Sequence, residues 1–274
     1  MRSFFVVLFT GLILSSCSMD SFLFNAEPLT EYTLSTAVIP DTGRIEVVLK
    51  SEGETIYGYY VRQTDSMRVK PHPTIIYHHG NRDHLQHYWD RVELLYQAGF
   101  DVFIYDYRGF GKSTGTSTEQ GLRADARAAL TYVLGRSDVD SSQIVHYGYS
   151  LGGFPSLYSA SELHTPRALI TESIFASGET LVQSGTLLNV PGSYLLEGAF
   201  DNTAPMQKRS CPVLLIHGTK DTFIGVETNG QRLYDVARQP RSFVRIEGAD
   251  HNNVPYVYGA QNYIDLITTF IRGN

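Results

Sequence analysis

The chain has 274 residues, a length that fits one large α/β domain or two small ones. Hydrophobic residues make up 42% of it and charged residues 18%, which excludes a disordered chain and indicates a packed globule. The net charge of −6, with no run of Lys or Arg, argues against nucleic acid as a partner, because phosphate binding needs a concentrated basic surface.

The first residues of the chain have the pattern of an export signal. Arg2 precedes the almost unbroken apolar stretch Phe4–Leu14, and small residues follow it. That stretch is too short for a transmembrane helix, which needs about 20 apolar residues. We therefore expect residues 1–16 to be a signal peptide, with an uncleaved anchor helix as the alternative.

The sequence Leu14-Ser15-Ser16-Cys17 resembles the lipobox of bacterial lipoproteins. The resemblance implies that Cys17 is lipidated, becomes the mature N-terminus and attaches the exported protein to a cell-envelope membrane. Ser18, rather than Asp, follows the cysteine, which favours the periplasmic side of the outer membrane if the source has one. Cys211, the second cysteine, would then lack a disulfide partner, and we expect it to be buried as a small apolar residue.

The next segment, 17–40, is expected to be a tether and lead-in whose Phe22, Leu23 and Phe24 dock onto a domain formed by 41–274. The domain begins with two segments in which apolar and polar residues alternate, Ile45–Leu49 and Thr55–Val61. A turn that contains Gly53 separates them. This pattern predicts an antiparallel hairpin.

After the hairpin, short apolar segments alternate with helical patterns. The apolar segments predict strands at Thr74–His78, Val102–Tyr107, Ile144–Tyr149, Ala168–Thr171, Val213–His217 and Phe243–Ile246. The helical patterns cover His84–Ala98, Glu119–Leu134, Leu151–Ala160, Val226–Ala237 and Pro255–Ile271. Strands that are apolar on both faces and alternate with helices predict an α/β fold, with a mostly parallel central sheet flanked by helices.

One interval, 173–210, separates two predicted strands by more than a usual connection. Its residues include many apolar side chains, among them Phe175, Leu187, Tyr194 and Phe200. We expect a small cap insertion over a binding site.

The segment Gly148-Tyr149-Ser150-Leu151-Gly152 matches the pattern G-x-S-x-G, between a predicted strand and a predicted helix. Glycines on both sides of the serine permit a sharp turn, which lifts the Ser150 hydroxyl above the sheet. A serine hydroxyl needs a neighbouring base to become nucleophilic. This context predicts Ser150 as a nucleophile.

The best candidate base is His251, in the loop after the last predicted strand. Asp221, in the loop after the preceding strand, is the best candidate for the acid that orients His251. Glu172, at the end of another strand, is its competitor. The carboxyl ends of parallel strands share one edge of a sheet, so these loops are expected to meet Ser150.

An oxyanion formed at a substrate carbonyl would need two backbone donors. The N–H of Leu151 is one candidate, and the N–H of Asn81, after Gly80 in the loop that follows a predicted strand, is the other. The neighbouring His78 and His79 are expected to be structural.

The sequence predicts no cofactor and no metal. Asp106 stands where a phosphate-binding P-loop ending in Gly111-Lys112-Ser113 would need its first glycine. Spacing typical of metal ligands is also absent from the sequence.

Together these segments resemble the α/β-hydrolase superfamily, and within it the BEM46-like, or serine aminopeptidase-like, group. The resemblance rests on His79-Gly80-Asn81, Asp106-Tyr107-Arg108-Gly109-Phe110-Gly111-Lys112-Ser113, Gly148-Tyr149-Ser150-Leu151-Gly152-Gly153, His217-Gly218 with Asp221, and Asp250-His251. It implies a Ser150–Asp221–His251 triad that cleaves carboxylic esters or thioesters of small or acyl substrates. A peptidase or amidase with the same triad, and a lipoprotein that uses the fold only for binding, are the alternatives. Tyr149 departs from the close group, where Arg or His is commoner.

Overall fold

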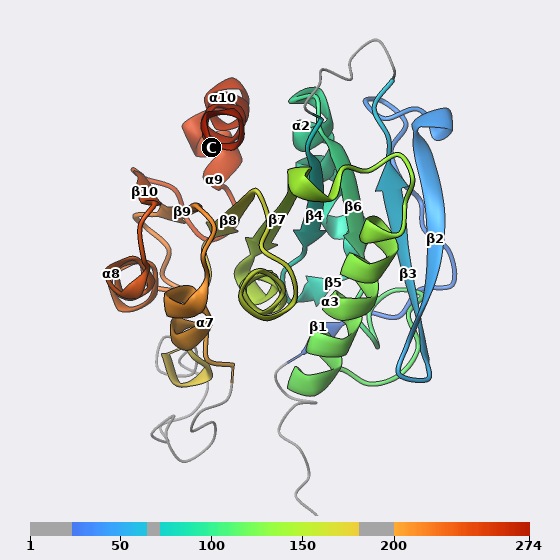
Figure 1. Cartoon of the computed structure of the whole chain (residues 1–274), viewed down its shortest axis with the longest axis horizontal. Helices are drawn as coiled ribbons and strands as arrows, with labels where there is room; N and C mark the ends of the chain where they lie inside the picture. Colours follow the sequence, from blue (N-terminus) through green and yellow to red (C-terminus); the bar gives the residue numbers. More distant parts are fainter. Residues whose placement is uncertain (1–23, 65–71, 181–199) are drawn as a thin grey trace, which may run out of the picture.

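The centre of the structure, a computed structural model that describes residues 24–64, 72–180 and 200–274, is an eight-stranded sheet. The strands lie in the order β10-β9-β8-β7-β4-β6-β3-β2 (Figure 1). Their bounds are β2 Arg44–Ser51, β3 Glu54–Val61, β4 Thr74–His78, β6 Asp101–Tyr105, β7 Ile144–Tyr149, β8 Ala168–Glu172, β9 Val213–Gly218 and β10 Arg241–Ile246. Only the pairs β2·β3 and β3·β6 of this sheet are antiparallel. The mostly parallel sheet is therefore confirmed.

Helices cover both faces of this sheet (Figure 1). On one face lie α2 (Trp89–Gln97), α9 (Val254–Tyr258) and α10 (Ala260–Gly273). On the other lie α3 (Glu119–Leu134), α4 (Gly153–Tyr158), α7 (Thr203–Lys208) and α8 (Arg232–Val236). Alternate strand residues belong to opposite layers: Ile75 of β4 packs with the α2 and α10 side, and Ile76 with the α3 side. This explains why these strands are apolar at nearly every position.

The C-terminal helix differs from the prediction. The single helical pattern at Pro255–Ile271 forms two helices, α9 and α10, which meet at Gly259. Gly259 has a φ of 89°, a left-handed conformation that a glycine adopts without a Cβ clash. The helix at Glu119–Leu134 was predicted with its observed bounds.

Residues 24–40, the described part of the expected lead-in, pack closely against the domain. β1 (Asn25–Ala26) pairs in parallel with β5 (Arg82–Asp83). The Phe24 ring lies 6.4 Å from that of Phe110 and 6.0 Å from that of Phe200, as its predicted docking requires. The predicted signal peptide, Cys17, the predicted docking residues Phe22 and Leu23, and the central part of the predicted cap, 181–199, lie outside the described residues.

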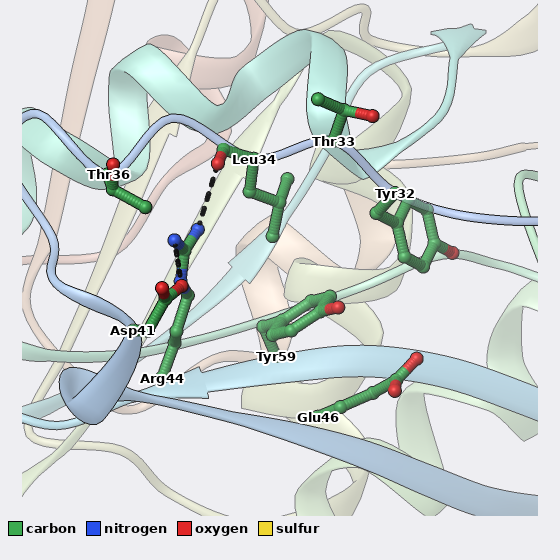
Figure 2. Close-up of a pocket in the computed structure, with 8 residues that line it drawn as sticks. All are labelled: Tyr32, Thr33, Leu34, Thr36, Asp41, Arg44, Glu46 and Tyr59. Atoms are coloured by element: carbon green, nitrogen blue, oxygen red, sulfur yellow. Dashed lines mark hydrogen bonds and ion pairs between the residues drawn. The ribbon is translucent and has the colours of Figure 1, made fainter.

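A hydrogen bond from Tyr32 attaches this segment to the buried side chain of Asp106. The Tyr32 hydroxyl donates to Asp106 Oδ2 at 2.5 Å, and the Leu85 N–H donates to Oδ1 at 2.6 Å. Arg44 of β2 holds the same segment further along, through a 3.1 Å hydrogen bond to the carbonyl oxygen of Leu34. Figure 2 shows Arg44 between Leu34 and Asp41, beside an open groove of about 470 Å³.

Cys211 is buried, as expected, and is not part of a disulfide. Burial raises the pKa of its thiol to about 11, so the thiol stays protonated and unreactive at neutral pH. Among the helices that the structure describes, none has the length and apolar character needed to cross a membrane.

The substitution Tyr32→Phe is expected to lower the free energy of unfolding by about 1–3 kcal/mol, because it leaves a buried Asp106 oxygen without its donor. Urea denaturation followed by circular dichroism measures the change. Tyr59→Phe is the matched control, because its ring packs 5.8 Å from the Tyr32 ring. Equal stability losses in the two variants would contradict the importance of the bond to Asp106.

Candidate active site

Ser150 occupies a strained turn between β7 and the helical segment that begins at Ser150 and continues as α4. Its φ is 53°, a left-handed conformation that costs a non-glycine residue about 1–3 kcal/mol. A Cβ on Gly152 would lie 1.9 Å from the carbonyl oxygen of His78, and one on Gly148 would lie 2.6 Å from the carbonyl oxygen of Gly152. Both positions therefore require glycine, and the turn has the geometry expected of a nucleophile elbow.

The structure brings the three predicted triad side chains together. His251 Nε2 lies 3.0 Å from Ser150 Oγ, and His251 Nδ1 lies 2.8 Å from Asp221 Oδ2. These contacts join residues 101 and 30 positions apart in the chain. When Nδ1 carries the ring proton and donates it to Asp221 Oδ2, Nε2 faces the serine as an acceptor.

Asp221 is held as a carboxylate by several donors. Burial would raise its pKa, but hydrogen bonds from His217, His251 and the Ile224 N–H outweigh burial and hold the pKa well below its usual range. Its Oδ1 accepts from the backbone N–H groups of Phe223 and Ile224 at 3.0 and 2.7 Å. The carboxylate is thus charged and fixed in orientation at neutral pH.

His217, which the sequence marked only as part of the resemblance, lies beside Asp221. His217 Nε2 lies 2.7 Å from the carbonyl oxygen of Ile224 and 3.3 Å from Asp221 Oδ2. Because a carbonyl oxygen only accepts, Nε2 carries the proton and donates it to Ile224, with the Asp221 carboxylate beside this N–H.

Glu172, the competing acid, has other partners. Its Oε1 accepts from Arg91 at 2.6 Å, and its Oε2 accepts from the hydroxyls of Tyr147 and Tyr263 at 2.5 Å each. The side chain is fully buried. The geometry therefore favours Asp221 as the partner of His251.

The loop after β4, which carries Asn81, lies directly against the elbow. Gly152 is close enough to His78 and His79 that the two backbones are in contact. Asn81 Oδ1 accepts from the Asn25 N–H at 3.1 Å, so its side chain faces the N-terminal segment. The backbone N–H groups of Asn81 and Leu151 remain the predicted oxyanion donors.

The histidines that precede Asn81 have structural partners. His78 Nδ1 lies 2.9 Å from the Tyr105 hydroxyl, and its Nε2 lies 3.0 Å from His146 Nδ1. Burial lowers the pKa of His146 to about 3 and that of His78 well below its usual value, so both rings are neutral. His79 Nδ1 donates to the Gly80 carbonyl oxygen at 2.7 Å.

Tyr149, immediately before the nucleophile, contacts both the loop of His251 and the loop of Gly80. Its hydroxyl lies 3.1 Å from the carbonyl oxygen of His251 and 3.1 Å from Asn252 Oδ1. A Cβ on Gly80 would lie 3.0 Å from the Tyr149 ring. Arg91 stacks 4.2 Å from the same ring and donates to the Asn252 carbonyl oxygen at 2.9 Å. The sequence marked this position only through its departure from Arg or His.

Aromatic side chains adjoin the elbow. Phe154 of α4 and Phe200 lie 5.1 Å apart, and both belong to one buried apolar cluster with Leu151 and Ile224. Phe223, 49% exposed, lies 5.0 Å from the His251 ring. Buried apolar side chains therefore pack behind the elbow, and the exposed Phe223 lies beside the catalytic base.

Within residues 24–64, 72–180 and 200–274, no group of three His, Cys, Asp or Glu side chains is arranged to hold a metal ion. The chemistry that the described geometry supports is nucleophilic attack by a serine.

Comparison with known proteins agrees with this architecture. Residues 73–170 match the family model of the alpha/beta hydrolase fold. The chain is 33% identical over 204 residues to uncharacterized protein YfhR of Escherichia coli K12, which covers 73% of this chain and 70% of that protein. It is 31% identical over 222 residues to human alpha/beta hydrolase domain-containing protein 17B, which covers 81% of this chain and 72% of that protein. The chain belongs to the α/β-hydrolase fold family.

Solved structures of esterases have the same fold. The Pyrococcus furiosus esterase Pf2001 superposes with a TM-score of 0.73 at 19% identity, over 91% of this chain and 98% of that one. An acetyl xylan esterase from Paenibacillus sp. R4 superposes with a TM-score of 0.68 at 17% identity, over 90% and 89% of the two chains. The predicted fold class is confirmed, and family membership supports a hydrolase.

The substitution Tyr149→Phe is expected to lower kcat toward a soluble ester roughly 10-fold with little change in KM, because the His251 loop loses its hydroxyl partner but the ring packing remains. Steady-state kinetics measure both constants. Tyr60→Phe is the control, since that buried hydroxyl bonds Asp101 at the opposite end of β6. A similar loss of kcat in both variants would show a general effect on stability instead.

Proposed function

We propose that this protein is a serine hydrolase that cleaves carboxylic ester or thioester bonds through an acyl-enzyme intermediate. The observation that carries the proposal is the continuous contact from Ser150 Oγ through His251 to Asp221, at 3.0 and 2.8 Å. A hydroxyl within hydrogen-bond distance of an oriented imidazole is an activated nucleophile.

In the first half of the reaction, Ser150 Oγ bonds to the substrate carbonyl carbon, and His251 Nε2 takes the hydroxyl proton. Asp221 stabilises the imidazolium that forms, because it is ionised and close to Nδ1. The tetrahedral oxyanion is held by the N–H groups of Leu151 and Asn81. His251 then protonates the departing alcohol or thiol as its bond to carbon breaks.

In the second half, water replaces the leaving group. His251 takes a proton from water, the hydroxide oxygen bonds to the acyl carbon, and the bond to Ser150 Oγ breaks as the serine regains its proton. The products are a carboxylic acid and free enzyme, so no cofactor is consumed.

The character of the substrate follows from the surface around the serine. The buried Phe154, Phe200 and Leu151 and the exposed Phe223 suit an acyl or aromatic group better than a charged one. The names of the similar structures, an esterase and an acetyl xylan esterase, support ester cleavage in this chain. The serine aminopeptidase-like alternative keeps the same triad, and amide cleavage tests it directly.

Wild-type protein is expected to react with a fluorophosphonate probe and to hydrolyse p-nitrophenyl esters. Ser150→Ala should abolish labelling and lower kcat by at least about 10⁴-fold, because the nucleophile is lost. Ser156→Ala, a buried serine of the adjacent helix, is the matched control and should retain labelling. Persistent labelling of Ser150→Ala would exclude Ser150 as the nucleophile.

The same panel should include aminoacyl anilides. Faster turnover of anilides than of esters would favour the peptidase alternative. If the protein hydrolyses neither esters nor anilides and reacts poorly with the fluorophosphonate probe, a binding role for the fold would be favoured.

We also propose that the protein is exported and attached by lipid at Cys17 to the cell-envelope membrane, on the periplasmic side of an outer membrane if the source has one. The support is the apolar stretch Phe4–Leu14 followed by Leu14-Ser15-Ser16-Cys17. More than one acyl chain at a single residue gives stable attachment, whereas one chain alone gives marginal binding.

Cells that express the protein and are fed radiolabelled palmitate are expected to incorporate label into the wild type but not into Cys17→Ala. Cys211→Ala is the matched control and should still be labelled. Label in Cys17→Ala, or wild-type protein that is released by a salt wash, would contradict attachment through Cys17.

A further inference from the structure

The N-terminal segment Phe24–Thr33, which we call the strap, is attached to the loop that carries Asn81. The Asn25 N–H donates to Asn81 Oδ1 at 3.1 Å, and β1 then pairs with β5, which follows Asn81 directly. The Glu27 N–H continues the contact by donating to the Asp83 carbonyl oxygen at 3.0 Å. The strap therefore begins at the predicted oxyanion loop.

The strap is also attached to the loop after β6. The Gly111 N–H donates to the Glu27 carbonyl oxygen at 2.9 Å, and the Leu29 N–H donates to the Gly111 carbonyl oxygen at 2.8 Å. Tyr32 then bonds Asp106, whose Oδ1 lies 3.2 Å from His79 Nε2. Because hydrogen bonds hold the strap along its length, it keeps one position beside the active site.

The start of the strap lies on the active-site side of the molecule. Phe24 packs on Phe110 and Phe200, and Phe200 packs on Phe154 of the helix that follows Ser150. Figure 1 shows β1 and β5 at the edge of the sheet toward which the parallel strands point, beside the N-terminal end of α3. The chain thus enters the domain at the same edge that carries the triad.

The chain between the proposed lipid site and the strap is short. Cys17 precedes Phe24 by seven residues, and seven residues span at most about 25 Å. A domain of about 250 residues has a diameter of about 45 Å by the usual scaling of the radius of gyration. A lipid on Cys17 therefore cannot reach a membrane that lies against the opposite side of the domain.

We propose that the strap holds the active-site edge toward the membrane in which Cys17 is anchored, so that acyl groups carried by molecules of that same membrane are the substrates. This inference rests on the proposed hydrolase activity and on attachment through Cys17. Phe223, exposed beside His251, lies where an apolar side chain would meet acyl chains that leave the bilayer.

The test lengthens the chain before the strap without changing the described domain. A 20-residue Gly/Ser linker is inserted between Met19 and Asp20, which increases the spacing from Cys17 to Phe24 from seven residues to about 27. Lipidated wild type and linker variant are reconstituted in vesicles of phosphatidylethanolamine and phosphatidylglycerol that contain 4-methylumbelliferyl palmitate. Both proteins are also assayed with p-nitrophenyl butyrate in solution.

The linker variant is expected to hydrolyse the palmitate ester about 5- to 10-fold more slowly, because effective concentration falls as roughly the −3/2 power of tether length. Its kcat/KM for the soluble butyrate ester should stay within about twofold of wild type, since the site itself is unchanged. Wild type should also act slowly on palmitate ester in separate vesicles.

The possible failures are distinguishable. If wild-type protein does not hydrolyse p-nitrophenyl butyrate, the proposed function is wrong. If both proteins hydrolyse the butyrate ester normally and also hydrolyse the palmitate ester in vesicles at equal rates, the strap does not hold the active-site edge toward the membrane. Equal rates for palmitate ester in the same and in separate vesicles would overturn the assignment of substrates to the anchoring membrane. In that assay, non-lipidated Cys17→Ala gives the rate without any tether.

Discussion

The contact between the backbone of Gly152 and the carbonyl group of His78 determines the arrangement of the catalytic edge. A Cβ at position 152 would lie 1.9 Å from that carbonyl oxygen, so two strand-end loops touch only because one residue lacks a side chain. The contact places the loop of Asn81 beside the elbow, in which Ser150 has a left-handed conformation. The strain at Ser150 is offset by the buried packing of β4, β7 and α4 around it.

Two carboxylates close to the site, Asp221 and Glu172, have different surroundings and different roles. Asp221 accepts from backbone N–H groups and lies beside two imidazoles, so it is ionised and able to stabilise a charged His251. Glu172 is fully buried and paired with Arg91, whose second contact is the backbone next to His251. One carboxylate therefore faces the proton-transfer path, and the other holds the loop that carries the base.

The described part of the predicted tether is fixed on the domain by hydrogen bonds. Residues 24–33 make a strand pair, several backbone hydrogen bonds and the buried contact from Tyr32 to Asp106. A segment held in this way fixes the point at which the chain enters the domain, beside the active-site edge. Lipid attachment at Cys17, if combined with this strap, would couple where the protein is anchored to which substrates it meets.

The sequence by itself determined most of the central strands and helices and the residue expected to act as nucleophile. Apolar runs at β4, β7 and β9 predicted a parallel sheet, and G-x-S-x-G between a strand and a helix marked Ser150, because these signals depend on residues close together in the chain. Only the tertiary structure decided between Asp221 and Glu172. Glu172 ends β8 and Asp221 follows the neighbouring β9, so the two differ mainly in which side chains from distant segments surround them. Likewise, the contacts of Tyr149 and of the strap join residues far apart in sequence, and no local pattern records them.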